Sequence, residues 1–341
     1  MLTMLSPSIS PLFSVAPMLG RAFGLPWPPG FFFDCFCCGG AIGYHLGGST
    51  ASGSTTATEK TTFADDVTVL VTTADISTER HGAGPIGKPD VAGYFSGGAT
   101  TSPDTVVGDT EKLTFSNEVT SSVGTATLST SRSEIAGLSE RDTKGYFLGG
   151  STDDLISGIT VVADKFTFSS ETASALGSAD LSVARYGHTG ISDGTTKGYV
   201  GGGATGSLSY IVSSDKLVYS TDTTAAQTTA DLSVARQDYT SVSNGDTKGY
   251  FCGGNTGGTS SVWDILTFST DTTAANTSGV SHWTATGNSD GVSAYIGGGI
   301  SSGYTLHIDK LTFATDSLAG VSVVDLDFSH SRGWGLCTTA L

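Results

Sequence analysis

The sequence predicts an all-β fold, a six-bladed β-propeller with four strands in each blade, from three observations. The 341 residues include 47 glycines and only 14% charged residues, with almost no window rich in residues that favour helices. A tyrosine motif that ends in a glycine pair recurs six times, at intervals of 45 to 53 residues. The two ends of the chain carry complementary parts of one repeat. Repeats of roughly 40 to 55 residues that hold four short strands are typical of propeller blades.

The first forty residues form an apolar arm ahead of the repeats. Pro7, Pro11 and Pro17 interrupt the apolar run, and Arg21 is the only basic residue before position 60. Because a secretory signal needs a basic start, and both it and a membrane-spanning helix need an unbroken apolar stretch, we expect neither. We expect residues 1–40 to be a docking arm and residues 41–341 to form the propeller. The arm packs either on its own domain or on a neighbouring subunit, and we favour the neighbouring subunit.

Each repeat combines a fixed frame with one variable loop. An acid leads an alternating strand after each tyrosine motif, and an arginine precedes the next motif. Four repeats keep 21 residues from acid to arginine and 14 from arginine to tyrosine, whereas 9 to 13 residues separate the glycine pair from the acid. The motifs are GYHLGG, GYFSGG, GYFLGG, GYVGGG, GYFCGG and AYIGGG, and the leading acids are Glu59, Glu111, Asp164, Asp215, Asp264 and Asp309. Variable loops on one face of a rigid frame are typical of a binding scaffold.

The two chain ends are expected to complete one blade together. After the sixth leading acid the sequence supplies an arginine strand with no tyrosine motif behind it, and the first motif has no arginine strand before it. We expect the C-terminal strand around Trp334 to Leu341 to pair with Ile42 to Gly48 in the N-terminal blade. This pairing closes the ring and leaves no open sheet edge between the first and last blades.

The repeats resemble a known family. An aromatic residue before a glycine pair, an acid-led aromatic strand and an arginine about a dozen residues before the next aromatic resemble kelch repeats over roughly residues 41–341. The chain departs from the kelch pattern because small residues such as Ala225 and Ala226 replace the expected tryptophan. The near-identical stretches STDTTAA, LSVAR and TKGY also resemble kelch-like repeats of bacteriophage tail-fibre-type structural proteins. The resemblance implies arginines close to the central channel, on the face that carries the variable loops.

The repeated arginines are the first candidate site. They could capture an acidic peptide or a carboxylate, or they could be satisfied by backbone carbonyls and blade acids. The leading acids could suggest the carboxylate pair of a glycosidase, but their recurrence, usually beside a lysine, favours an exposed strand start. The arginines of the ring are Arg80, Arg132, Arg185 and Arg236, with Arg332 near the C-terminus.

Aromatic residues on one rim are the second candidate site. Counting 14 residues back from Tyr295 reaches Ser281 in place of an arginine, and Trp283 follows two residues later. Trp334 likewise follows Arg332 by two residues. Such a cluster could stack on a sugar ring or an apolar peptide side chain, or it could serve packing between blades. The candidate ligand-binding residues are Trp263, His282, Trp283, Tyr304, Arg332 and Trp334.

Charge, cysteine and motif usage argue against several classes of function. A net charge of −16 repels nucleic acid. No closed zinc pattern accompanies the cysteines, and Gly201 to Gly203 lack the residues of a phosphate-binding loop. The six histidines occupy no equivalent positions, and no nucleophile and base can be recognised. We therefore expect no catalysis, no metal and no cofactor. The cysteines Cys35, Cys37 and Cys38 are expected to be buried thiols, with a bond from one of them to Cys337 left open.

The sequence thus favours a non-enzymatic propeller displayed on a larger assembly, extracellular or at a virion surface. The expected partners are other subunits, bound through the arm in a homo-oligomer, and a cell-surface glycan or protein receptor, with no membrane insertion. A virion tail or tail-fibre-type adhesin fits this description. The alternatives are a carbohydrate-active propeller enzyme that uses acids in its channel and a purely structural subunit of a filament or shell.

Overall fold

The computed structural model describes residues 42–50, 53–101, 104–153, 157–206, 209–276, 283–300, 305–320, 326 and 334–337. The chain divides into two units, Met1–Cys37 and Cys38–Leu341, and every described residue belongs to the second. The predicted arm, residues 1–40, lies outside the described residues.

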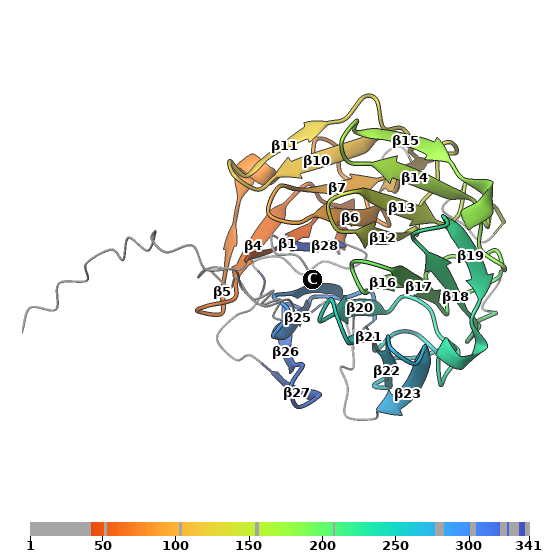
Figure 1. The fold of residues 1–341 in the computed structure, drawn as a ribbon. Helices are drawn as coiled ribbons and strands as arrows, with labels where there is room; N and C mark the ends of the chain where they lie inside the picture. The colour runs from red at the N-terminus through yellow and green to blue at the C-terminus, as the bar shows by residue number, and fades with distance from the viewer. Residues whose placement is uncertain are drawn as a thin grey trace, which may run out of the picture. The chain divides into compact units, whose positions relative to one another are not determined.

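Six four-stranded antiparallel sheets form a ring in the second unit, which confirms the predicted six-bladed β-propeller (Figure 1). Inner strands such as β6, β12, β16 and β20 surround the centre of the ring, and β5, β11, β15, β19, β23 and β27 lie at its periphery. Blades 1 to 3 comprise β28 (Trp334–Cys337), β1 (Ile42–Leu46), β4 (Thr58–Thr62) and β5 (Val67–Leu70); β6 (Gly84–Lys88), β7 (Ala92–Ser96), β10 (Thr110–Thr114) and β11 (Val119–Ser122); β12 (Ala136–Glu140), β13 (Lys144–Leu148), β14 (Ala163–Thr167) and β15 (Thr172–Ala175).

Blades 4 to 6 repeat this order of strands. They comprise β16 (Thr189–Ser192), β17 (Lys197–Gly201), β18 (Ser214–Val218) and β19 (Thr223–Ala226); β20 (Thr240–Ser243), β21 (Lys248–Cys252), β22 (Trp263–Thr267) and β23 (Thr272–Asn276); β24 (Thr286–Ser289), β25 (Ser293–Gly297), β26 (Ile308–Thr312) and β27 (Ser317–Gly320). Two short hairpins lie in the variable loops of blades 1 and 2, β2 (Ser49–Thr50) with β3 (Gly53–Ser54) and β8 (Ala99–Thr101) with β9 (Asp104–Val106).

Blade 1 combines strands from the two ends of the repeat region. β28 runs antiparallel to β1, with Gly43 opposite Cys337 and Leu46 opposite Trp334. The predicted strand also includes residues 338–341, which lie outside the described residues.

The two ends of each blade carry different connections. The antiparallel strand order places the variable loop, between the second and third strands, at the same end as the segment that enters the next blade. A backbone hydrogen bond joins the two, as from Gly150 N to Arg185 O (2.9 Å). Gly150 has a φ of +100°, and a Cβ there would lie 2.3 Å from the carbonyl oxygen of Ser133, so the glycine pair is needed for this junction. We call this end the loop face and the opposite end, which carries the β-hairpin turns, the hairpin face.

A contact between tyrosine, acid and lysine joins each blade to the next at the hairpin face. The motif residue Tyr94 donates a hydrogen bond to Glu171 (2.8 Å), in the turn between the third and fourth strands of the next blade. Lys112 pairs with the same carboxylate at 2.6 Å, and the Tyr94 ring packs against Phe168 of that blade. Acids occupy this turn in all six blades with left-handed φ angles of 50° to 55°, and we call them the turn acids: Asp66, Glu118, Glu171, Asp222, Asp271 and Asp316.

The same contact joins the last blade to the first. Tyr295 and Lys310 of blade 6 both bond to Asp66 of blade 1, and Tyr295 stacks on Phe63 with a centroid distance of 4.8 Å. Burial alone would raise the pKa of Asp66, but the hydrogen bonds from Lys310 and Tyr295 lower it overall. The turn acid therefore stays charged at neutral pH and holds two side chains of the neighbouring blade.

Candidate functional site

The four described arginines of the predicted ring are buried within their blades, each at most 1% exposed. The guanidinium of Arg132 lies 2.7 Å from Oδ2 of Asp164 and donates hydrogen bonds to the carbonyl oxygens of Gly149 (2.8 Å) and Phe147 (3.0 Å). Oδ1 of the same aspartate accepts a hydrogen bond from the backbone N–H of Ser129 (3.1 Å). The other pairs are Arg80–Glu111 (2.8 Å), Arg185–Asp215 (3.0 Å) and Arg236–Asp264 (2.7 Å).

These contacts fasten the incoming segment to its blade. They match the structural role considered for the arginines and leave none of the four guanidinium groups free for an acidic ligand. None of the four is among the residues that line the central cavity, although each stands two residues before one that does. The expectation of exposed strand starts is wrong for five leading acids, which are at most 1% exposed: Glu59, Glu111, Asp164, Asp215 and Asp264. The last four carry the counter-charges of the buried arginines.

Only part of the predicted aromatic rim lies among the described residues, and one of its members, Trp263, belongs to the core instead. Trp263 is fully buried in β22, where its ring packs against Tyr250, so a ligand cannot reach it. Trp334 lies within β28, whereas Trp283 precedes β24 and is partly exposed. His282, Tyr304 and Arg332 lie outside the described residues.

The strand register corrects the position of Trp283 in its repeat. Its backbone forms the same isolated bridge to the variable loop as that of Gln237, which directly follows an arginine. The hairpin between the first and second strands is one residue shorter in blade 6 than in blade 5. Counting 14 residues back from Tyr295 therefore reaches a position one residue too early. In sequence order, therefore, His282 rather than Ser281 replaces the arginine.

Five residues with left-handed backbones line the mouth of the central channel at the loop face. Each stands two positions after the arginine or its replacement, has a φ of 55° to 66° and lines the central cavity. Adjacent members are joined through the backbone, as from Asp238 N to Gly187 O (2.7 Å). We call the five the mouth residues: Gly82, Glu134, Gly187, Asp238 and Thr284.

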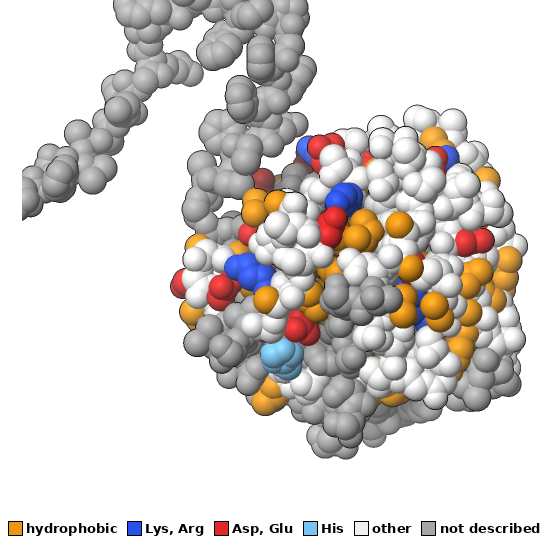
Figure 2. Space-filling view, turned by 90° about the horizontal axis from the view of Figure 1, so that it is seen from below, with side chains coloured by type: hydrophobic (Ala, Val, Ile, Leu, Met, Phe, Trp, Pro, Cys, Tyr) orange, Lys and Arg blue, Asp and Glu red, His pale blue; other side chains and the backbone are white. Residues whose placement is uncertain are grey.

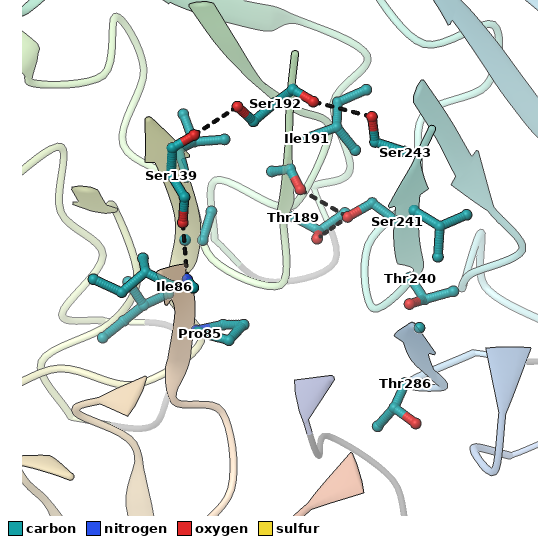
Figure 3. Close-up of a pocket in the computed structure, with 18 of the residues that line it drawn as sticks. Pro85, Ile86, Ser139, Thr189, Ile191, Ser192, Thr240, Ser241, Ser243 and Thr286 are labelled. Atoms are coloured by element: carbon teal, nitrogen blue, oxygen red, sulfur yellow. Dashed lines mark hydrogen bonds between the residues drawn. The ribbon is translucent and has the colours of Figure 1, made fainter. Parts of the chain in front are cut away.

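The mouth opens into a cavity of about 290 Å³ that the inner strands enclose (Figure 3). Gly137 allows β12 to approach β6 here, since a Cβ would lie 1.7 Å from the carbonyl oxygen of Pro85. Serine hydroxyls join neighbouring inner strands, because Ser192 donates to the carbonyl of Ser139 (2.8 Å) and Ser243 to that of Ser192 (3.0 Å). The hydroxyl oxygens are also used within the wall, because Ser192 Oγ accepts a hydrogen bond from the N–H of Gly194 (2.8 Å) and Ser243 Oγ from that of Gly245 (2.8 Å).

Two aromatic residues next to mouth residues in the chain are partly exposed. Tyr186 and Trp283 stand directly before the mouth residues Gly187 and Thr284. The backbone of Tyr186 pairs with Ala204 at the start of a variable loop, so this residue belongs to the loop face. Aromatic residues at the loop face, together with the carboxylates and the hydroxyl of the mouth residues, suit a sugar, which stacks through its apolar face and donates hydrogen bonds from its hydroxyl groups.

Sequence reasoning missed Tyr186 and the two acidic mouth residues, Glu134 and Asp238. A usable signal exists, because the arginine is constant in four repeats while the two residues after it read HG, SE, YG and QD. When residues vary directly beside a constant structural residue, the fold does not require a particular side chain at those positions.

A buried histidine forms part of the cavity wall. Nε2 of His188 lies 3.0 Å from the carbonyl oxygen of Leu148, which assigns the hydrogen to this nitrogen. Nδ1 has no hydrogen-bond partner among the described residues. Burial, followed by the charge of Arg185, lowers the pKa of His188 from 6.5 to about 3. The ring is therefore a neutral acceptor at the cavity.

We expect His188 to make the propeller less stable as the pH falls from neutral. The unfolded chain takes up a proton near pH 6.5 and the folded chain only near pH 3, so stability is complete above about pH 6.5 and then declines by up to about 1.4 kcal/mol per pH unit. Urea denaturation of the wild type and of His188→Gln at several pH values measures this slope. Protonation of the turn acids lowers the stability of the fold only at lower pH, because the pKa values of these carboxyl groups lie below the usual range. An equal slope for both proteins between about pH 6 and pH 4.5 contradicts the assignment.

The face seen in Figure 2 shows no strong segregation of charge among its described residues. In Figure 2, acidic and basic side chains lie next to one another among uncharged and apolar ones. Within the described ranges, no cluster of three or more His, Cys, Asp or Glu residues could hold a metal ion. The described part of the chain also has no helix with the length and apolar character needed to cross a membrane. Cys252 is a free, buried thiol whose pKa burial raises to about 12.

Comparison of the chain with protein-family models gave no match, and a search of curated proteins found none with significant similarity. The geometry of the loop face is therefore the main guide to function.

Proposed function

We propose that this chain is a non-enzymatic binding and assembly protein. The propeller presents a ligand site at the channel mouth of the loop face, and the N-terminal arm attaches the protein to a larger assembly. In its narrower form, the proposal is a kelch-like propeller at an extracellular or virion surface, such as a tail-fibre-type adhesin that recognises a glycan or a protein receptor.

One contrast supports the ligand site. The charged residues that repeat from blade to blade are engaged in contacts within and between blades, as Arg132 is with Asp164 and Tyr94 with Glu171. The mouth positions, by contrast, carry two glycines, two carboxylates and a hydroxyl on a constant backbone. A constant frame with variable residues around a cavity is the arrangement expected of a binding scaffold.

The chemistry of the mouth favours a carbohydrate over an acidic peptide. Glu134 and Asp238 would repel a carboxylate, whereas they accept hydrogen bonds from sugar hydroxyls. Tyr186 and Trp283 add surfaces for stacking.

The second candidate is a carbohydrate-active propeller enzyme. Glu134 and Asp238 favour it, because both carboxylates line the cavity and glycoside hydrolysis uses a pair of carboxyl groups.

A glycan array followed by an assay for released reducing sugar separates the two candidates. We expect the wild type to bind one class of glycan and to leave it intact. Turnover that Glu134→Gln or Asp238→Asn abolishes contradicts the binding proposal and supports the enzyme. If the folded protein binds no glycan, the carbohydrate part of the proposal is wrong.

A further inference from the structure

The outer strand of blade 1 differs from the other outer strands. In β5, Val67, Val69 and Leu70 are 44%, 42% and 39% exposed. The other outer strands read VTSS, TASA, TTAA, TTAAN and SLAG. Together these five strands carry a single exposed large apolar residue, Val119. Blade 1 alone therefore presents an apolar outer strand.

β5 is also a sheet edge. It ends the strand order β28-β1-β4-β5, so one row of its backbone groups faces away from β4. Proteins usually protect such an edge with charged residues or proline, and β5 contains neither. Val67 and Val69 point to one face of the sheet and Leu70 to the other, because side chains alternate along a strand. A strand added here gains backbone partners and apolar contacts on both faces.

We propose that β5 binds the N-terminal arm of a second copy of this chain, which adds residues 31–38 to blade 1 as a fifth strand. The inference rests on the assembly role given to the arm under the proposed function, and it names the surface that receives the arm.

The sequence of the arm identifies the segment. Residues 31–38 read FFFDCFCC, a run without proline, with one charge and with four phenylalanines, which favour strands. Pro26, Pro28 and Pro29 precede the run, and Gly39 and Gly40 follow it. Residues 31–38 are therefore the longest proline-delimited segment of the arm rich in strand-forming residues, and they outnumber the four residues of β5.

The strand register argues for a second copy. Ile42 of β1 lies opposite Thr62 of β4, which lies opposite Val67 of β5, so the arm joins the sheet at the end where β5 begins. A strand added to β5 lies three strand spacings from β1, about 14 Å. The four Cα steps from Cys38 to Ile42 span at most about 14 Å when straight, which leaves no length to pass the β4–β5 turn and reverse direction. The arm of another copy has no such limit.

This exchange defines the assembly. Each copy carries one arm and one acceptor strand, so two copies that exchange arms form a closed dimer, and head-to-tail exchange gives a larger ring or a chain. In each of these forms, every occupied β5 has an arm from another copy.

Native mass spectrometry of the full-length chain and three variants tests the proposal. We expect the wild type to be oligomeric, and Val67→Lys/Val69→Lys to have the mass of a single chain because the added charges block the edge. The matched control Thr223→Lys/Ala225→Lys alters the equivalent positions of blade 4 and keeps the wild-type mass. Deletion of residues 1–40 also gives single chains. Circular dichroism checks that each variant is folded.

A mixture of two of the variants provides the decisive test. The deletion protein has an acceptor and no arm, and Val67→Lys/Val69→Lys has an arm and no acceptor, so together they form a complex that neither forms alone. No complex in the mixture, or a single-chain wild type, overturns the inference.

The outcomes separate this inference from the assembly role of the arm. If the deletion abolishes the oligomer and Val67→Lys/Val69→Lys does not, the arm assembles elsewhere and the β5 site is wrong. If the deletion protein keeps the wild-type mass, both the β5 site and the self-assembly role of the arm are wrong.

Discussion

Arg132→Met is expected to lower the free energy of unfolding by about 3–5 kcal/mol, measured by urea denaturation at neutral pH. The substitution removes the partner of Asp164, which is fully buried, and leaves the carbonyl oxygens of Gly149 and Phe147 without their donor. A buried charge without a partner is among the most destabilising changes known in folded proteins.

Two further variants make this prediction specific to the buried pair. Arg132→Met/Asp164→Leu removes both charges and should recover part of the lost stability, since the uncompensated carboxylate is gone. Arg141→Met, at a partly exposed arginine in the next hairpin, should change stability by less than about 1 kcal/mol. A loss below about 1 kcal/mol for Arg132→Met would mean that the ring does not depend on this contact.

The double variant Trp283→Ala/Tyr186→Ala is expected to weaken glycan binding roughly 100-fold, since truncation of one aromatic contact costs about 1.4 kcal/mol, or tenfold. Isothermal titration with the glycan selected on the array measures the loss. Both side chains are partly exposed, so we expect the thermal stability of the propeller to change little.

A matched control lies at the other end of the same blade. Val292, in the turn after β24, is 57% exposed, and Val292→Ala should bind as the wild type does. Equal affinity of the double variant and the wild type would remove the aromatic residues from the site.

The frame of the propeller could be predicted because its spacing is strict. The six tyrosine motifs set the number of blades, and the constant distances from leading acid to arginine and from arginine to tyrosine, kept in four repeats, set the order of strands within them. The buried state of Asp164 could not be predicted in the same way. Lys165 beside it suggested a solvated strand start, but adjacent residues of a strand point to opposite faces. Lys165 reaches Asp222 of the next blade, and Asp164 turns to Arg132.

The contact between blades was present in the sequence as a second constant spacing. An acid stands three residues after the aromatic that follows each leading acid, as Asp271 follows Phe268. Turn chemistry alone explains such a residue locally, because aspartate tolerates the left-handed conformation of the turn. Its second role requires the neighbouring blade, from which Tyr199 and Lys197 reach the carboxylate.

The candidate site was harder to predict because it depends on register. One residue fewer in the hairpin of blade 6 displaced the count that related Trp283 to the arginines. Trp263 looked like a loop residue from its position after a glycine pair, yet it begins β22 and packs in the core. Such differences follow from strand ends, which sequence patterns define least well.

Hydrogen exchange of the backbone amides, with and without the selected glycan, tests most directly whether the ligand binds where the blades differ. The account predicts slower exchange at the loop face, in the segments 133–136, 186–190, 237–240 and 283–287, and unchanged exchange in the hairpins around residues 140–143, 193–197 and 244–248. Protection confined to those hairpins or to the outer strands, with no change at the mouth residues, would contradict the central claim.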